Sequence, residues 1–430
     1  MNVGIVGGGI AGLTAAYELT KRGINCTIYE RSPEVGGLAG FFEVNGVLLE
    51  KFYHHLFTSD TAIADMIEEL GLGQDLEWKP IVTSYYANRI YRLSSPLDVL
   101  RFKPLNLIDR FRLGLLAIVP RLINDWKPLE DITAKEWLIR YGGSNVYENV
   151  WGPLMRGKFG VYADQVAAVW IWNKLKLRGG SRGKGQKENL GYLKGGFGRA
   201  IRAWQEKLQL MGVQILTATP VEQIIVEEGR ATGIQARGAF QPHDRILVTT
   251  APALFSQLTP SLPPDYKERL ASIIYLANVC LVLNLDRSLS DTYWLNINDP
   301  TVPFVAVVEH TNMQRPEEYG GQHIAYVSRY MPANDKYAQM APDELLEAYL
   351  PHLRKLFPAF ERSWVKNYWA WREDFAQPVI TKRYSALKPP FRTPISDLWL
   401  CSMAQVYPED RGMNYAVVYA RRAVNEMLGE

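Results

Sequence analysis

The chain has 430 residues, more than one hydrophobic core usually organises, so we expect two domains. Hydrophobic residues make up 47% and charged residues 22% of the sequence, which excludes a largely disordered chain. The formal net charge of +3 is small, and no recognition motif accompanies it. We therefore expect no nucleic-acid partner.

The three cysteines, Cys26, Cys280 and Cys401, lie far apart and form no CxxC pair. This spacing is typical of a reducing cytoplasm, and with no matching histidine or carboxylate cluster we expect no metal site. No window reaches the roughly 18 uncharged apolar residues of a membrane-spanning helix. Because the first residues already form a strand, we expect no signal peptide and a cytoplasmic protein, with peripheral membrane contact left open.

The N-terminus carries a dinucleotide-binding pattern, in which the apolar strand Val3–Val6 runs into three glycines and then a helix of small residues. Gly7 allows the tight turn, Gly9 lets backbone approach a pyrophosphate, and Gly12 lets the helix pack closely on the sheet. The helix N-terminus directs unpaired N–H groups and its positive end at the phosphates. The residues assigned to this loop are Gly7, Gly8, Gly9, Ala11 and Gly12.

A second strand, Asn25–Tyr29, ends at Glu30, about 20 residues after the glycine loop. A carboxylate at this point accepts hydrogen bonds from the adenosine ribose hydroxyls and disfavours a 2′-phosphate. We assign Glu30 and its neighbour Arg31 to the cofactor site. The pattern alone does not choose between FAD and NAD.

Segments of different character alternate along the chain. Strand-and-helix patterns recur in 1–80, 191–270 and 386–430, whereas 81–190 and 271–385 are rich in aromatic residues. We expect the first three to form an α/β domain of the dinucleotide-binding, Rossmann-like type. The other two are expected to form a mixed α+β substrate domain.

Further motifs accompany the glycine loop: Gly36-Gly37, the run Gly191-Tyr192-Leu193-Lys194-Gly195-Gly196, Val221 in the strand after it, and a terminal strand, loop and helix. With these motifs the sequence resembles the flavin amine oxidase superfamily, which includes protoporphyrinogen oxidase, the carotene desaturases and, more distantly, UDP-galactopyranose mutase. The resemblance implies FAD as the cofactor. We expect noncovalent attachment, because no cysteine or histidine matches a known linkage motif.

The resemblance also implies individual cofactor contacts. Gly36 and Gly37 would place backbone against the flavin side of the pyrophosphate, and Val221 would pair through its backbone with the adenine ring. The loop Asp410-Arg411-Gly412-Met413-Asn414 would lie beside the ribityl chain and the pyrimidine end of the flavin, with Gly412, Met413 and Asn414 assigned to cofactor binding. The chain departs from the family at Leu38, assigned to the same site, where an arginine is usual, and at Ser402-Met403-Ala404, where Gly-Asp is usual.

His54 and His55 lie where the family's chain passes the flavin ring. Either one of them positions substrate or accepts a proton, or both stack structurally against the cofactor. Adjacent residues in an extended segment point oppositely, so at most one faces the ring. We assign His54, His55 and Arg329 as candidate catalytic residues. For Glu309–Asn312 and for an aromatic set (Trp369, Trp371, Tyr384 and Tyr415), pocket lining and ordinary core packing both stay open, with packing favoured.

Two other segments have alternative interpretations. Lys174–Lys194 holds seven basic residues and one acid among five glycines. It is either a lid that attracts an anionic substrate or, the favoured alternative, a solvated loop. Leu107–Trp126 predicts one amphipathic helix, which either lies on a membrane surface or, as favoured, is buried in the substrate domain.

The leading functional prediction is an FAD-dependent oxidoreductase, similar to protoporphyrinogen oxidase or a desaturase, that accepts hydride from a small organic substrate onto flavin N5. Oxygen or another acceptor would then take the electrons. The alternative is a non-redox UDP-sugar mutase that uses reduced flavin as a nucleophile. A third hypothesis is a binding protein that holds FAD as a fixed ligand.

Overall fold

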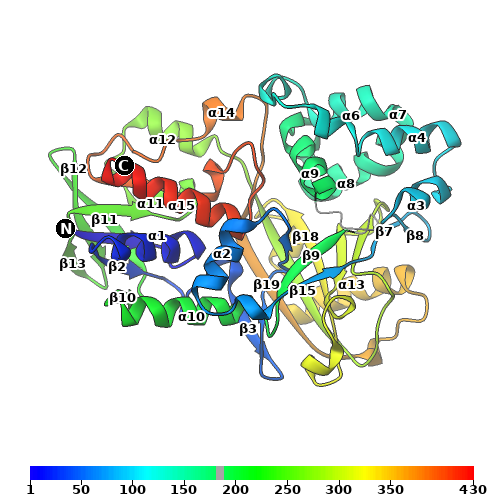
Figure 1. Cartoon of the computed structure of the whole chain (residues 1–430), viewed down its shortest axis with the longest axis horizontal. Coiled ribbons are helices and arrows are strands. Elements are labelled where there is room, and N and C mark those ends of the chain that lie inside the picture. The colour runs from blue at the N-terminus through cyan, green and yellow to red at the C-terminus, as the bar shows by residue number, and fades with distance from the viewer. Residues whose placement is uncertain (181–187) are drawn as a thin grey trace.

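The computed structural model describes residues 1–180 and 188–430. A five-stranded parallel sheet, in the order β10-β2-β1-β14-β20, lies at the end of the molecule that holds both termini (Figure 1). The central strand β1 (Asn2–Val6) pairs with β2 (Asn25–Tyr29) and β14 (Arg245–Val248), and β10 (Gln214–Leu216) and β20 (Leu398–Leu400) form the edges. The strands are almost continuously apolar and buried, as expected for a parallel sheet covered on both faces.

Helices cover one face of this sheet. The helix α1 (Ile10–Lys21) lies between α10 (Phe197–Leu210) and α15 (Met413–Leu428) (Figure 1). Its glycine and alanine positions allow the close approach that the sequence predicts, and Gly12 is buried. At the far end of α15, Gly429 adopts φ +77°, a conformation that favours glycine and ends the helix.

The other face is covered by an antiparallel sheet of β11 (Val221–Glu227), β12 (Arg230–Ala236) and β13 (Ala239–Pro242). Apolar side chains from β11, β12 and β14 share one core with α11 (Pro252–Leu258) and α12 (Pro264–Ala271). Gly229 lies in the turn between β11 and β12, with φ +78°.

Short elements connect this domain to the rest of the chain. They are the pair β3 (Phe41–Val44) and β4 (Val47–Glu50), the helix α2 (Thr61–Glu69), and a small sheet in the order β5-β9-β6 (Leu56–Phe57, Asn189–Leu193 and Leu76–Pro80). The small sheet joins residues from both sides of the helical segment, so it fixes where that segment leaves and re-enters the nucleotide domain.

The substrate domain is built on a seven-stranded mixed sheet in the order β19-β15-β18-β17-β16-β7-β8. Its strands are Val365–Pro378, Tyr275–Leu285, His323–Met331, Ala306–Glu309, Trp294–Ile297, Thr83–Tyr86 and Ile90–Arg92. The amphipathic helix α13 (Pro342–Leu356) buries its leucines against one face. The short helix α14 (Tyr384–Leu387) precedes β20.

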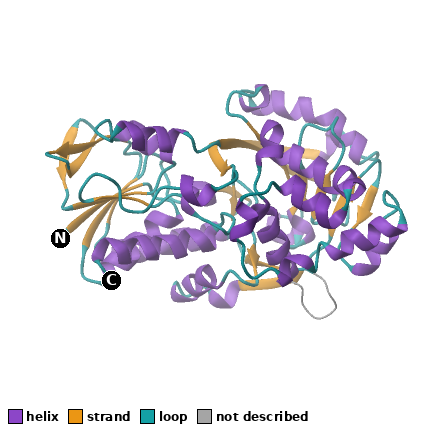
Figure 2. Ribbon diagram, turned by 90° about the horizontal axis from the view of Figure 1, so that it is seen from above, coloured by secondary structure: helices purple, strands orange, loops and turns teal. Residues whose placement is uncertain are grey.

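A helical lobe completes the substrate domain at the end of the molecule away from the termini (Figures 1 and 2). It contains α3 (Pro96–Arg101), α4 (Leu107–Leu115), α5 (Val119–Leu122), α6 (Ala134–Gly142), α7 (Ser144–Val146), a π-helical turn (Tyr147–Trp151), α8 (Gly152–Phe159) and α9 (Ala168–Gly180). Its core is aromatic, with Trp137, Tyr147 and Phe159 fully buried.

The prediction of one helix over Leu107–Trp126 is wrong. The helix α4 ends at Leu115, and α5 covers only Val119–Leu122. The favoured prediction that this segment is buried is also wrong, because Phe111 is 70% and Leu122 74% exposed. Only the opposite side, with Leu113 and Leu116, packs into the lobe.

The five-stranded parallel sheet draws its strands from 1–80, 191–270 and 386–430, and the mixed sheet draws its strands from 81–190 and 271–385. On the basis of this division we propose the domain limits given in the sequence analysis. In the described ranges, no helix is long and apolar enough to cross a bilayer.

Candidate functional site

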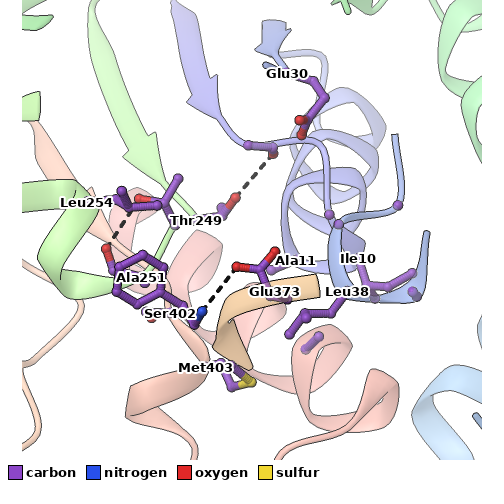
Figure 3. A pocket seen from close by; sticks show the side chains of 18 of the residues that line it. Ile10, Ala11, Glu30, Leu38, Thr249, Ala251, Leu254, Glu373, Ser402 and Met403 are labelled. Carbon is purple, nitrogen blue, oxygen red and sulfur yellow. Dashed lines mark hydrogen bonds between the residues drawn. The ribbon is translucent and has the colours of Figure 1, made fainter. Parts of the chain in front are cut away.

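A cavity of about 610 Å³ opens above the carboxyl ends of β1 and β2. This is the edge at which doubly wound sheets bind their ligands. Its walls come from the glycine loop, the Gly36-Gly37 turn, the start of β11, the residues after β14 and β20, and the strand β19 (Figure 3). A volume of this size is in the range of small-molecule and cofactor sites.

The glycine loop leaves room for a ligand in one place and is closely packed in another. A Cβ built on Gly9 would meet nothing closer than the Gly37 Cα, at 3.8 Å, so this side of the loop is open to the cavity. A Cβ on Gly12 would lie 2.0 Å from the carbonyl oxygen of Gly7. Gly9 thus serves the ligand space and Gly12 the packing of α1, as the spacing predicts.

Glu30 is buried at the end of β2 and connects this strand to the glycine loop. Its Oε2 accepts the Gly8 N–H at 2.7 Å, and its Oε1 accepts the Ser32 N–H at 2.8 Å. A carboxylate has about four acceptor positions, so two remain for hydroxyl groups of a ligand. Glu30 and Thr249 lie on the same cavity in Figure 3.

Most residues assigned to the cofactor from sequence line this cavity: Gly7, Gly9, Ala11, Glu30, Arg31, Gly36, Gly37, Leu38, Val221, Gly412 and Met413. Gly8 and Gly12 lie behind it and shape the loop. The assignment of Asn414 is not supported, because this side chain is buried away from the cavity and accepts the Ile63 N–H at 3.2 Å. It therefore fixes α2 on α15.

A second cavity, of about 280 Å³, lies between the helical lobe and the mixed sheet. The two cavities share six lining residues: Leu38, Phe52, His54, Arg411, Gly412 and Met413. They therefore meet at the segment after β4 and at the loop before α15. A ligand in the first cavity and a ligand in the second would touch at this junction.

The two histidines occupy different positions, as expected for neighbours in an extended segment. His54 lines both cavities and its Nδ1 lies 2.6 Å from the carbonyl oxygen of Phe52, whereas His55 lines only the second cavity and its Nδ1 lies 3.2 Å from the Tyr293 hydroxyl. Burial lowers the pKa of His54 to about 4 and that of His55 to about 3. Both rings are therefore neutral at pH 7 and weakly basic.

The structure does not support Arg329 as a catalytic residue. Its guanidinium contacts Asp335 at 3.1 Å and the carbonyl oxygen of Pro303, and the residue lines neither cavity. The long strand β18 directs this side chain to the side of the sheet that faces away from the cavities. A carboxylate partner satisfies its charge there.

Among the other candidates, Glu309 accepts hydrogen bonds from Ser288 and from the backbone N–H groups of Leu289 and Ser290, so its role is structural. His310 lies 2.6 Å from the Tyr319 hydroxyl inside the core. Of the four aromatic residues considered for a pocket wall, Trp371 lines the first cavity and Tyr415 the second.

Charged residues that the sequence did not single out line the second cavity. Asp410, in the loop before α15, pairs with Lys174 of α9 and accepts the Trp170 indole N–H at 3.2 Å. Burial alone would raise the pKa of this carboxyl. The positive charges of Lys174, Lys158 and Arg411 have the larger combined effect, so the pKa is well below the usual value. Arg411 donates to Gln377 at 2.9 Å and to the Tyr330 hydroxyl at 2.8 Å.

The basic stretch Lys174–Lys194 is only partly described, because residues 181–187 lie outside the described ranges. Of its remaining cations, Lys174 and Arg178 line the second cavity from α9. A third cation of this cavity, Lys158 of α8, had no signal in the sequence, because only the packing of α8 brings it beside α9. The described part of the chain contains no cluster of three or more His, Cys, Asp or Glu side chains suited to a metal ion.

Comparison with curated proteins gives distant relatives, among them two that are named as porphyrinogen oxidases. Coproporphyrinogen III oxidase of Staphylococcus aureus is 25% identical over 289 residues, which cover 59% of this chain and 61% of that protein. Protoporphyrinogen oxidase 2 of Arabidopsis thaliana is 23% identical over 193 residues, covering 41% and 37%. The chain thus spans less than two thirds of the length of these relatives.

Solved structures share the fold over the whole chain. A candidate protoporphyrinogen oxidase from an Exiguobacterium species gives a TM-score of 0.80 at 19% identity, covering 100% of this chain and 99% of that one. Reduced UDP-galactopyranose mutase gives 0.78 at 16% identity, covering 100% and 95%. The family model for flavin containing amine oxidoreductases matches residues 10–428, so the protein belongs to this family of flavin-dependent oxidoreductases.

Proposed function

We propose that the protein is an FAD-dependent oxidoreductase that takes hydride from a small organic substrate onto flavin N5, with oxygen or another acceptor receiving the electrons. The observation that carries this proposal is the junction of the two cavities at Leu38, His54 and Gly412. One cavity has the features of a dinucleotide site, and the other adjoins it from the substrate domain. When bound, the flavin supplies the hydride-accepting chemistry.

The residues of the first cavity fit FAD. The open side of Gly9 and the N-terminus of α1 suit a pyrophosphate, Glu30 suits the adenosine ribose, and Val221 lies where the adenine ring is expected. We propose noncovalent binding. Cys401 lines this cavity, but burial raises the pKa of its thiol to about 12, so the nucleophilic thiolate is scarcely populated at neutral pH.

The chain's own residues provide orientation and electrostatics at the junction. The helix α15 begins at Met413 with Gly412 as its N-cap, so its positive end faces both cavities. Arg411 is held by Gln377 and Tyr330 and adds a fixed positive charge beside it. This arrangement favours the negative charge that develops on a reduced flavin. The apolar wall of Leu38 and Phe52 limits access of water.

The proposal is tested by anaerobic mixing of the FAD-loaded protein with candidate substrates, read as loss of flavin absorbance at about 450 nm. Coproporphyrinogen III, protoporphyrinogen and ζ-carotene represent the desaturase-like and porphyrinogen-oxidising relatives, and putrescine represents the amine oxidases. Reduction by one of them, followed by reoxidation with oxygen or a dye, supports the proposal. Failure of every class to reduce the flavin would argue against it.

The alternative is a UDP-sugar mutase, and the cations of the second cavity are the observation in its favour. A nucleotide diphosphate usually calls for arginines paired with each phosphate. Here Arg178 lies 4.0 Å from Glu188, and Arg411 is bonded to Gln377 and Tyr330. We therefore expect that UDP and UDP-sugars neither change the flavin spectrum nor raise the unfolding temperature at millimolar concentration. Tight UDP binding to the reduced form, without redox turnover, would favour the mutase.

We also propose peripheral membrane contact through the outer face of the helical lobe. In the described part of the chain, thirteen large apolar side chains are exposed, and eight of them lie between residues 97 and 122. They are Leu97, Leu100, Leu107, Ile108, Phe111, Leu115, Ile118 and Leu122. Patches of this kind mark interaction surfaces in soluble proteins. Exposed Arg101, Lys103, Arg112 and Arg121 accompany them, which suits anionic lipid headgroups.

Co-sedimentation with phosphatidylcholine vesicles, with and without phosphatidylglycerol, tests this contact. We expect binding that strengthens with the anionic lipid and is lost in the double variant Leu107→Ser/Phe111→Ser. The control Leu210→Ser changes a leucine on α10, outside this face, that is even more exposed than Leu107 and Phe111, and it should bind as the wild type does. Equal binding by both variants would refute the assignment of this face.

A further inference from the structure

The cations of the second cavity differ in how their charges are balanced. Lys174 pairs with Asp410, and Arg178 lies 4.0 Å from Glu188. Arg411 is satisfied by the neutral oxygens of Gln377 and Tyr330. Lys158 is the remaining cation on the described wall, and its surroundings are different.

The ammonium of Lys158 lies among aromatic rings. Its Nζ is 4.8 Å from the centre of the Trp170 ring and 5.2 Å from that of Tyr330. In the described part of the chain, no oxygen accepts a hydrogen bond from it and no carboxylate lies within ion-pair distance. The side chain lines the second cavity and is only partly exposed there. Burying such a group without an acceptor costs free energy unless a ligand supplies one.

The carboxylates of the cavity are already bonded to other groups, although the negative charge of Asp410 acts on Lys158 through space. Asp410 is committed to Lys174 and Trp170, and Asp60 accepts the Phe57 N–H at 2.8 Å. Burial raises the pKa of Asp60 to about 6, so this carboxyl is mostly ionised at pH 7 and becomes protonated only in mild acid. The described wall of the cavity thus has four lysine and arginine side chains against two carboxyls, and Lys158 is the basic side chain without an acceptor of its own.

We propose that Lys158 binds the carboxylate of an organic acid in the second cavity, with Trp170 and Tyr330 flanking the apolar part of that ligand. This inference rests on the proposed function in taking the second cavity as the substrate site. It selects the substrate class: a cationic amine would meet four cations, and a hydrocarbon would leave Lys158 without an acceptor. One unpaired cation suits a single carboxylate rather than a diphosphate.

Proton uptake should accompany this binding. Burial, together with Lys174, Arg411 and Arg178, keeps the pKa of Lys158 well below its usual value, although Asp410 opposes the shift. Tyr330 is the other titratable group that faces it. A carboxylate favours the ammonium form, so its affinity should fall as the pH rises above the pKa of Lys158, by up to about tenfold per pH unit.

Four aromatic probes of similar shape test the proposal on the FAD-loaded protein: benzoate, phenyl phosphate, benzyl alcohol and benzylamine. Calorimetry and perturbation of the flavin spectrum report binding without any turnover. We expect benzoate to bind saturably, more tightly than the other three probes, and more weakly at higher pH. Benzylamine binding as tightly as benzoate, tighter binding of phenyl phosphate, or no saturable binding of benzoate would each overturn the carboxylate subsite.

Variants assign the effect to one residue. Lys158→Met keeps the length of the side chain and removes the charge. It should lower benzoate affinity at least tenfold, the change in an equilibrium constant that corresponds to about one pKa unit. Lys158→Arg should restore most of the affinity. Lys176→Met is the matched control, because Lys176 is an exposed neighbour on α9 that stacks on Trp172 and lines neither cavity.

Flavin content and unfolding temperature of each variant show whether it folds. Equal benzoate affinity in folded Lys158→Met and Lys176→Met would refute the role of Lys158. Lys158-dependent benzoate binding, combined with no flavin reduction by any substrate, would leave the subsite standing and contradict the redox function instead. The two proposals can therefore fail independently.

Discussion

Replacing Glu30 by alanine should weaken FAD binding and loosen the glycine loop. The side chain is 7% exposed, and its two oxygens accept the N–H groups of Gly8 and Ser32. Removing the carboxylate leaves the buried Gly8 N–H and the partly buried Ser32 N–H without this acceptor, and it deletes the group that we propose to face the ribose. Hydrogen bonds to charged groups contribute about 1.5–3 kcal/mol each.

Because the two backbone donors lose their acceptor in both the apoprotein and the complex, only part of this energy appears in FAD affinity. We expect a loss of about 1–3 kcal/mol in FAD binding, which corresponds to about 5- to 150-fold in Kd. The thermal stability of the apoprotein should also fall. Glu30→Gln should be intermediate, since its amide retains one oxygen acceptor.

The assay is titration of the apoprotein with FAD, read by quenching of flavin fluorescence. Glu34→Ala is the control, because Glu34 is exposed, lies four residues on and removes the same charge without touching the cavity. A Kd that is the same in Glu30→Ala and Glu34→Ala would refute Glu30 as the ribose ligand. A stability loss without an affinity loss would reduce its role to support of the loop.

Three further outcomes are expected. Gly9→Asp should abolish FAD binding yet leave a folded protein, because a Cβ at this position meets no atom closer than 3.8 Å. Gly12→Ala should instead detach α1 from the sheet, because its Cβ would lie 2.0 Å from the Gly7 carbonyl oxygen. Circular dichroism and FAD titration distinguish the two outcomes. The unfolded chain protonates its histidines below about pH 6.5, whereas folded His54 and His55 bind protons only near pH 4 and pH 3. The free energy of unfolding should therefore decrease as the pH falls from about 6.5 towards 3. Urea denaturation should show a less steep decrease for His55→Phe. Acid precipitation should release intact FAD into the supernatant, and colour retained by the denatured protein would contradict noncovalent binding.

The nucleotide half of the site could be predicted because its signals are local. Gly9, Gly12 and Glu30 act through backbone geometry and short-range spacing, and the strand order follows from that pattern. The resemblance added Val221 and the loop before α15, which lie far apart in sequence and line the same cavity. Asn414 does not line this cavity, because the direction of a side chain at a helix start depends on tertiary packing, here with α2.

The substrate half could not be predicted in the same way. Arg329 lies on a strand that contributes to the correct sheet, but its side chain points away from the cavities. Apolar residues on both faces of β18 hide the alternation. Lys158 becomes a cavity residue only because α8 follows a π-helical turn and packs beside α9. The apolar residues of α4 repeat with the spacing of a buried helix, so the sequence alone does not distinguish this exposed face from one packed in a core.

The loop Asp410-Arg411-Gly412-Met413 links every part of the proposed site. Asp410 reaches the helical lobe through Lys174 and Trp170, and Arg411 reaches the mixed sheet through Gln377 and Tyr330. The same loop begins α15, which packs on α1 of the nucleotide domain and also contacts α2 and β20. A ligand carboxylate at Lys158 would add a negative charge close to Asp410, and this added charge would act on the loop that borders the cofactor cavity. Occupancy of the second cavity should therefore change the electrostatic environment of the flavin before any electron is transferred. The flavin spectrum is for this reason a suitable reporter of carboxylate binding at Lys158.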